Sequence, residues 1–194
     1  MHCCRELIVA EGVTAVSARR IAGQIGCALG SLYNVYEGID AVIMAVNGLT
    51  LDEIEHQVLE TVAKRQEPIA TMLELGCRYV TFSHDHYHLW STLLEYPRHQ
   101  GVELPAWYQA KVDRIFTIIG KVILPLVAGD AAKAEMAGKV LWSGFHGISA
   151  LAIRGRLSST HTEAAQVMVA SLVRHYLSGL QARQGEKSCP SPPE

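Results

Sequence analysis

The chain has 194 residues, of which 49% are hydrophobic and 19% are charged, and its formal net charge is −2. This length and composition suit one or two globular domains with a sizeable core and argue against a disordered chain. No apolar run reaches the roughly 18 residues that a membrane-spanning helix needs, and the first residues do not form a secretory signal, so we expect a cytoplasmic protein without a membrane partner.

The first helix is predicted to run from the N-terminus to Glu11, where Gly12 ends it. A second begins after Ser17, whose hydroxyl can cap an orphan backbone N–H. Its apolar residues recur at the i, i+3, i+4, i+7 spacing of one helical face: Ala18, Ile21, Ala22 and Ile25. Gly26 then fits the left-handed position after a helix end, because glycine has no Cβ to clash.

A third helix is predicted to start within two residues of Gly26 and to place Leu32, Val35 and Tyr36 inward. Two short helices joined by a tight, glycine-bearing turn form a helix-turn-helix, whose second helix can enter a DNA major groove. The pattern alone leaves open a helical hairpin that binds no DNA.

The rest of the chain is predicted to be helical as well. Asp40 can cap a long helix that continues to Gln66, and Pro68 fits the first turn of the next. The polar stretch 83–88 interrupts that helix, and Pro97 ends it. Further helices are expected after Pro105, from Asp130 to about Arg154, and from Thr162.

These helices define an all-α fold, since no segment shows convincing strand alternation. We expect a helix-turn-helix domain over 1–48 that lacks part of its first helix. A larger helical domain should cover 51–184, and a disordered tail 185–194, because that tail has three prolines and no apolar periodicity.

Several motifs of the N-terminal region occur in an order and spacing that span Glu6 to Val46 without a gap. They are Ala10-Glu11-Gly12, Ala18-Arg19-Arg20-Ile21-Ala22, Gly26, Gly30-Ser31-Leu32-Tyr33, Tyr36 and Asp40-Ala41. In these residues the chain resembles the DNA-binding domain of the TetR/AcrR family of transcriptional regulators. The segment Trp142 to Gly147 also resembles a W-H-G helix in some ligand domains of that family. The resemblance implies an all-helical, dimeric, ligand-responsive repressor.

The resemblance also implies which residues face DNA. They are Ser17, Arg19, Arg20, Ala28, Leu29, Gly30, Ser31, Tyr33 and Asn34. Gly30 would allow close approach of the backbone, Ser31 and Asn34 could bond base edges, and the two arginines would clamp the phosphate backbone. A solvated polar helix face is the alternative interpretation.

Three positions depart from the family pattern in ways that remove phosphate contacts. Ala28 stands where Ser or Thr is usual, Leu29 where Lys or Arg is common, and Ile39 where Lys is usual. The first 50 residues also carry three arginines against four carboxylates, although phosphate neutralisation normally supplies most of the affinity for DNA. These departures predict weakened DNA binding without a change of fold.

Aromatic and apolar residues distributed over several helices are candidates for an effector pocket. They are Tyr79, Phe82, Trp90, Leu94, Trp107, Phe116, Trp142 and His146. His146 could orient a polar effector, but a close-packed core is the default for such residues in a helical domain.

Metal binding is considered at two places and is not predicted at either. His84, His86 and His88 alternate within a polar stretch that suggests a turn, and residues two apart do not share a helix face. The five cysteines are Cys3, Cys4, Cys27, Cys77 and Cys189. They have no zinc-site spacing, so we expect reduced thiols, no metal and no cofactor.

The last two helices are the predicted homodimer surface. Small residues on the first would allow close approach: Ala137, Gly138, Ser143, Gly144, Gly147 and Ala150. The second offers Ala164, Ala165, Met168, Leu172 and Tyr176. A two-fold interface here would space two recognition helices for successive major grooves.

The sequence therefore predicts a regulator that binds operator DNA, responds to a small-molecule effector and acts as a repressor. The alternative is a helical interaction protein that keeps the fold but has lost strong DNA affinity. An enzyme is not predicted, because no nucleophile–base pair, phosphate loop or paired catalytic carboxylates stand out.

Overall fold

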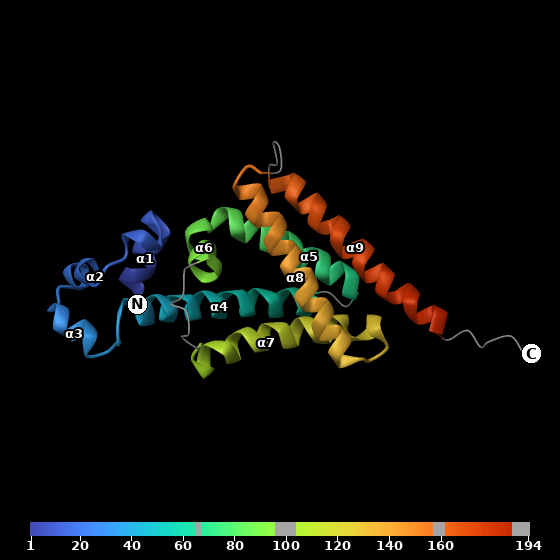
Figure 1. Ribbon diagram of the computed structural model, residues 1–194, viewed down its shortest axis with the longest axis horizontal. Coiled ribbons are helices and arrows are strands. Elements are labelled where there is room, and N and C mark those ends of the chain that lie inside the picture. The colour runs from blue at the N-terminus through green and yellow to red at the C-terminus, as the bar shows by residue number, and fades with distance from the viewer. Residues whose placement is uncertain (65–66, 96–103, 157–161, 188–194) are drawn as a thin grey trace, which may run out of the picture. The chain divides into compact units, whose positions relative to one another are not determined.

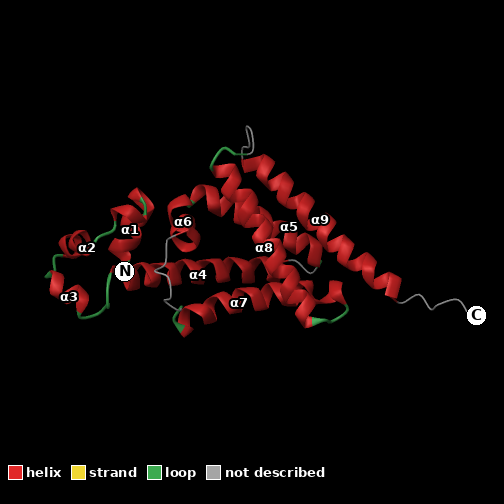
Figure 2. Ribbon diagram, in the orientation of Figure 1, coloured by secondary structure: helices red, strands yellow, loops and turns green. Residues whose placement is uncertain are grey.

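The computed structural model describes residues 1–64, 67–95, 104–156 and 162–187. Over these ranges the chain is helical and contains no strand, which confirms the all-α fold (Figure 2). The helices are α1 (His2–Glu11), α2 (Ala18–Ile25), α3 (Leu29–Tyr33), α4 (Ile39–Lys64), α5 (Pro68–Asp85), α6 (Tyr87–Glu95), α7 (Ala106–Ile123), α8 (Ala131–Ile153) and α9 (Thr162–Lys187) (Figure 1). Short 3₁₀ turns lie at Val13–Ala15 and Leu124–Val127.

Most helix boundaries agree with the expected start and stop signals, but Asp40 lies inside the first turn of α4, which begins at Ile39, and does not cap it as predicted. Asp130 caps α8 by accepting a hydrogen bond from the Lys133 backbone N–H at 3.0 Å. The break expected within 83–88 is the short connection between α5 and α6. Pro125 follows α7 in a 3₁₀ turn, because a proline cannot donate the hydrogen bond that would continue the helix. Helix α9 continues to Lys187, and the rest of the expected tail lies outside the described residues.

The chain divides into two compact units. The first comprises Met1–Ile54 and Asp85–Lys111, and the second comprises Glu55–His84 and Val112–Glu194. The expected boundary between 48 and 51 therefore lies within the first unit, and α6 belongs with the N-terminal helices. Chain order alone does not predict this grouping, which depends on packing between α1 and α6.

The core of the first unit joins α1 to its neighbours. Its buried residues are Cys4, Leu7, Ile8, Ile21, Leu32, Val42, Val46 and Leu89. Desolvation by burial raises the pKa of the Cys4 thiol to about 11, so this side chain is an inert apolar contact near neutral pH. His88 of α6 adds a polar tie, since its Nδ1 lies 3.0 Å from the Val9 carbonyl oxygen.

Two residues that were expected to face inward are exposed instead. Ile25 is 51% exposed and Val35 is 72% exposed. Ile25 is the last residue of α2. Val35 lies beyond the end of α3, which spans only five residues. The i, i+3 spacing that relates Leu32 to Val35 holds only inside a helix, so that prediction is wrong.

The core of the second unit is a seam between α8 and α9. Ala165, Val169, Val173 and Leu177 recur every four residues on α9, and each is at most 1% exposed. They pack with the buried face of α8, which includes Leu141 and Phe145. Such a strict i, i+4 row is the signature of one helix face turned to a core.

Gly76 of α5 is required by this packing, and its replacement by alanine should destabilise the second unit. A Cβ there would overlap Val169 Cγ1 and lie 3.0 Å from Phe145 Cζ. Overpacking of this kind typically costs about 1–3 kcal/mol. We expect thermal denaturation to show a lower melting temperature for Gly76→Ala.

The matched control is Gly120→Ala on α7, where no atom lies within 4 Å of the new Cβ. Because alanine favours the helix over glycine by about 1 kcal/mol, this variant should be as stable as the parent or more so. Equal melting temperatures for Gly76→Ala and Gly120→Ala would contradict the tight contact.

Candidate nucleic-acid interface and effector site

The turn between α2 and α3 has the geometry that its sequence predicts. Ser17 Oγ accepts a hydrogen bond from the Arg20 backbone N–H at 3.3 Å, which caps the start of α2. Gly26 adopts the left-handed conformation with φ of 69°, and Cys27 N–H donates to the Ala22 carbonyl at 3.0 Å. These bonds end α2 sharply and allow α3 to begin at Leu29 after Ala28, which provides no side-chain cap.

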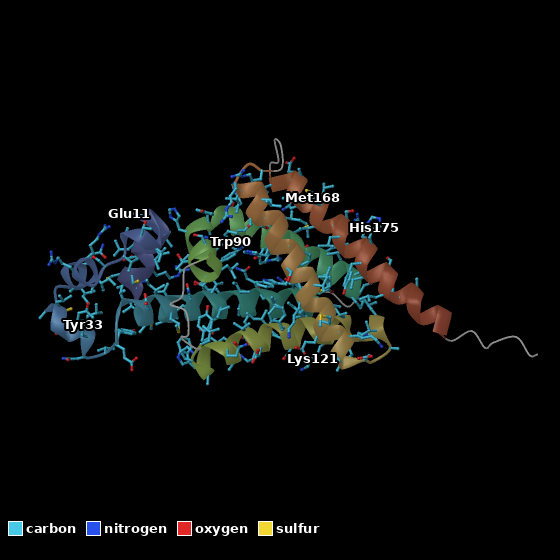
Figure 3. All side chains as sticks on the ribbon, in the orientation of Figure 1. Glu11, Tyr33, Trp90, Lys121, Met168 and His175 are labelled. Carbon is cyan, nitrogen blue, oxygen red and sulfur yellow. The ribbon has the colours of Figure 1, made fainter. Side chains whose placement is uncertain are left out.

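All the residues expected to face DNA are exposed. They are Ser17, Arg19, Arg20, Ala28, Leu29, Gly30, Ser31, Tyr33 and Asn34. On α3, Leu29 and Tyr33 lie one turn apart and are 42% and 51% exposed, whereas Leu32 is 8% exposed and joins the core (Figure 3). Helix α3 therefore has one face packed in the core and one face free.

The arginines of this region are largely engaged within the protein. Arg20 forms a two-pronged ion pair with Glu11, with distances of 2.6 Å and 3.0 Å, and also donates to the Ala15 carbonyl at 3.2 Å. The Arg20 guanidinium lowers the pKa of the Glu11 carboxyl by hydrogen bonding. Arg5 pairs with Glu53 at 2.8 Å.

Arg19 differs from these two arginines. It is exposed, and it has no ion pair with any residue in the described ranges. One arginine of the three is therefore ready to meet a phosphate without first breaking an internal pair.

In the second unit, four of the predicted effector-pocket residues form a connected cluster. Tyr79 Oη and His146 Nδ1 are 3.1 Å apart. The His146 ring stacks on Trp142 with centroids 5.8 Å apart, and Phe116 meets Trp142 edge to face at 5.8 Å. The cluster combines apolar ring surface with a hydrogen-bonded tyrosine–histidine pair on α5, α7 and α8, and none of its four members is fully buried.

The other predicted pocket residues are not part of that cluster. Phe82 is half-buried in the second unit, whereas Trp90, Leu94 and Trp107 belong to the first unit. Trp90 is 1% exposed and lies near Tyr87, with ring centroids 6.2 Å apart. Trp107 is 46% exposed and covers Gly48.

The sequence analysis missed a polar side chain, Ser149, on the face of α8 that carries Trp142 and His146. Ser149 follows His146 by three residues and Trp142 by seven, which places all three on one side of the helix. Ser149 is 1% exposed, and its Oγ has no hydrogen-bond partner among the described residues. The i, i+3, i+7 spacing from Trp142 is the signal that could have indicated it.

Some small residues of the predicted dimer helices pack inside the protomer, and others lie on its surface. A Cβ on Gly138 would approach Ile119 Cγ2 at 3.1 Å, and one on Gly144 would overlap Leu172. These glycines therefore serve packing within one protomer. The exposed stripe of α8 comprises Met136, Val140, Ser143 and Leu151, with the half-buried Gly147 between the last two. Ser143 and Gly147 belong to the predicted set, whereas the sequence analysis missed the three large side chains.

The histidines of the α5–α6 region lie where a turn was expected. His84 lies in the last turn of α5, His86 is in the connection and His88 lies in the first turn of α6. Within the described residues, no group of three or more His, Cys, Asp or Glu side chains is arranged to hold a metal ion.

No single helix in the described ranges is long and apolar enough to cross a membrane. The bent pair Ala106–Val127 and Ala131–Ile153 meets the criteria of length and composition only when the two are taken together.

The described residues form an all-helical fold, and comparison with known proteins gives the family. Residues 72–176, more than half of the chain, match the model of the tetracyclin repressor-like C-terminal domain. The chain belongs to this tetracyclin repressor-like (TetR-like) family of regulators.

Two solved structures are similar over nearly the whole chain. A protein of unknown function from Rhodococcus sp. RHA1 has a TM-score of 0.75, and the candidate regulatory protein SCO4313 has a TM-score of 0.67. Each is 18% identical, and each alignment covers 93% of this chain and 92% of the other. At this identity the likeness shows the fold alone. No curated protein sequence gives a significant match.

Proposed function

We propose that the protein is a dimeric, ligand-responsive transcriptional repressor that binds operator DNA through α2 and α3. The observation that carries the proposal is the capped helix-turn-helix whose complete set of expected DNA-facing residues is exposed. An operator-bound regulator would act in the cytoplasm. No cofactor and no enzymatic activity are part of this proposal.

The proposed effector site is the cluster of Tyr79, Phe116, Trp142 and His146. Aromatic side chains can hold a planar apolar molecule. The tyrosine–histidine pair and the unpartnered Ser149 hydroxyl offer hydrogen bonds that would orient its polar end. Effector binding would favour one spacing of the two DNA-binding domains of the dimer. It would weaken operator affinity to the extent that the effector binds that state more tightly than the operator-bound state.

The proposed dimer surface combines the exposed stripe of α8 with the outer face of α9. On α8, Met136 is 61% exposed and Val140 is 39% exposed. On α9, Val167 is 69% exposed and Met168 is 39% exposed (Figure 3). Exposed apolar side chains on two adjacent helices suit a four-helix contact between two copies of the chain.

A second candidate function is favoured by the arginine pairs. With Arg5 and Arg20 engaged by carboxylates, one free arginine per helix-turn-helix supplies little phosphate neutralisation. A helical interaction protein that has lost strong DNA affinity would show this pattern.

Selection from a random pool of duplex DNA separates the two functions. The full chain would be incubated with the pool, and bound duplexes would be recovered and sequenced over several rounds. The repressor proposal predicts enrichment of an inverted repeat whose half-sites lie about one helical turn apart. A pool that remains unenriched while the protein stays folded would favour the interaction protein.

Glu11→Gln should strengthen DNA binding, because it releases Arg20 for a phosphate. The pair is lost without removal of the arginine, so each protomer gains one available cation. At low salt we expect an affinity about fivefold to tenfold higher and, for a dimer, a salt slope steeper by about 2. Fluorescence anisotropy on the enriched duplex measures both quantities.

Glu53→Gln is the matched control, since it makes the same charge change but releases Arg5, which is not among the expected DNA-facing residues. Its effect on affinity should be smaller. If both variants tighten binding equally, general charge accounts for the gain and Arg20 has no special role.

A further inference from the structure

The exposed side of the helix-turn-helix carries large apolar side chains and few arginines that are free of an internal ion pair. Four large hydrophobic side chains between residues 25 and 35 are 42% to 72% exposed: Ile25, Leu29, Tyr33 and Val35. Single exposed apolar residues are common on protein surfaces, but four within eleven residues form a local concentration.

Among these four residues, Leu29 has the position from which bases are read. It is the first residue of α3, and residues at the start of a recognition helix contact base edges. Ile25 ends α2 and Val35 lies beyond α3. Leu29 is 42% exposed and is not among the residues of the first unit's core, unlike the buried Leu32 three residues later.

The chemistry of this surface fits one kind of base pair. In the major groove, thymine presents a C5-methyl group that apolar side chains contact, and adenine presents a donor and an acceptor that suit an asparagine amide. Leu29 offers the apolar contact, and the exposed Asn34 offers the amide. Both groups recognise A·T pairs.

We infer that Leu29 is a specificity-determining residue that reads the methyl group of a thymine in the operator half-site. The inference rests on the proposed DNA-binding function and names the base chemistry of its target. Contact with a methyl group compensates in part for the scarcity of free arginines, because burial of apolar surface is insensitive to the counterions that weaken phosphate contacts.

The test replaces thymine by uracil, which removes only the methyl group. Each thymine of the duplex enriched by selection would be replaced in turn, and dissociation constants would be measured for the parent and for Leu29→Ala. For the parent, we expect a loss of about threefold to tenfold at one thymine in each half-site. Leu29→Ala should bind the thymine and uracil duplexes equally at that position.

Val9→Ala is the matched control, since Val9 is 49% exposed in the same unit but lies on α1. This variant should keep the parent's preference for thymine. Circular dichroism should show all three proteins equally folded, because both replaced side chains are exposed.

The outcomes separate this inference from the proposed function. Equal affinity of the parent for thymine and uracil at every position would overturn the inference and leave the repressor intact. Discrimination that persists in Leu29→Ala would show that another residue reads the methyl group, which also overturns it. If selection enriches no duplex, the DNA-binding function itself fails, and the inference fails with it.

Discussion

Val140→Glu is expected to convert the dimer into a monomer and to weaken operator binding by about 100-fold or more. Val140 lies at the middle of the exposed stripe of α8. In a two-fold interface each substitution occurs twice, so two carboxylates would be buried without partners. Burial of each carboxylate costs several kcal/mol of the free energy of dimerisation, which is enough to dissociate the dimer.

Light scattering coupled to size exclusion measures the first part of this result. The parent should elute as a species of twice the 21.2 kDa chain mass, and Val140→Glu at the chain mass itself. The loss of operator binding follows because a monomer contacts only one half-site, whereas a dimer gains affinity from binding both half-sites at once.

Leu59→Glu is the matched control for this result. Leu59 is 48% exposed in the second unit but lies on α4, which is not one of the two helices of the proposed interface. This variant should remain dimeric. A dimeric Val140→Glu protein, or a parent that is monomeric at all concentrations, would contradict the proposed interface.

Trp90→Ala is expected to lower the free energy of unfolding by about 3–5 kcal/mol, a large share of the total for a protein of this size. Trp90 is 1% exposed on α6 (Figure 3), so its truncation leaves a cavity in the first unit. Urea denaturation followed by circular dichroism measures the change.

Trp107→Ala is the matched control, because it removes a tryptophan that is only partly buried. Trp107 is 46% exposed, so about half of its surface is already in water and its loss should cost less than the loss of the fully buried Trp90. Both tryptophans were candidates for an effector pocket. If Trp90→Ala proves no more destabilising than Trp107→Ala, then Trp90 does not have the close-packed role described here.

Local signals were enough to predict much of the fold. Ser17 and Gly26 act within one turn of their own helix, so the sequence indicates the cap and the left-handed end directly. Asp130 and Pro125 are further examples, since capping and the missing proline N–H are properties of single residues. The all-α class follows from the same helical spacing throughout the chain.

Contacts between distant segments were not predictable from spacing. The Glu11–Arg20 pair joins two helices, and no local spacing rule favours this pair over an unpaired Arg20. The grouping of α6 with α1 depends on packing across 79 residues, as the His88–Val9 hydrogen bond illustrates. For the same reason, the sequence did not separate the buried Trp90 from the clustered Trp142.

The effector cluster was predicted in part. Tyr79, Phe116, Trp142 and His146 meet in the second unit, and three of them are joined by ring contacts that composition alone does not specify. Ser149 was missed because a lone serine on an apolar helix face carries no signal until its burial is known.

A salt titration of DNA binding tests the central claim most directly. Dissociation constants of the full chain would be measured for the enriched duplex and for a scrambled duplex of the same composition, between low and physiological salt. With Arg19, or Arg19 and Arg20, on each of two half-sites, the logarithm of the binding constant should fall with a slope of about −2 to −4. The enriched duplex should be preferred by about 1,000-fold or more. Equal affinity for the two duplexes, or no binding at low salt, would contradict the assignment of the protein as an operator-binding repressor.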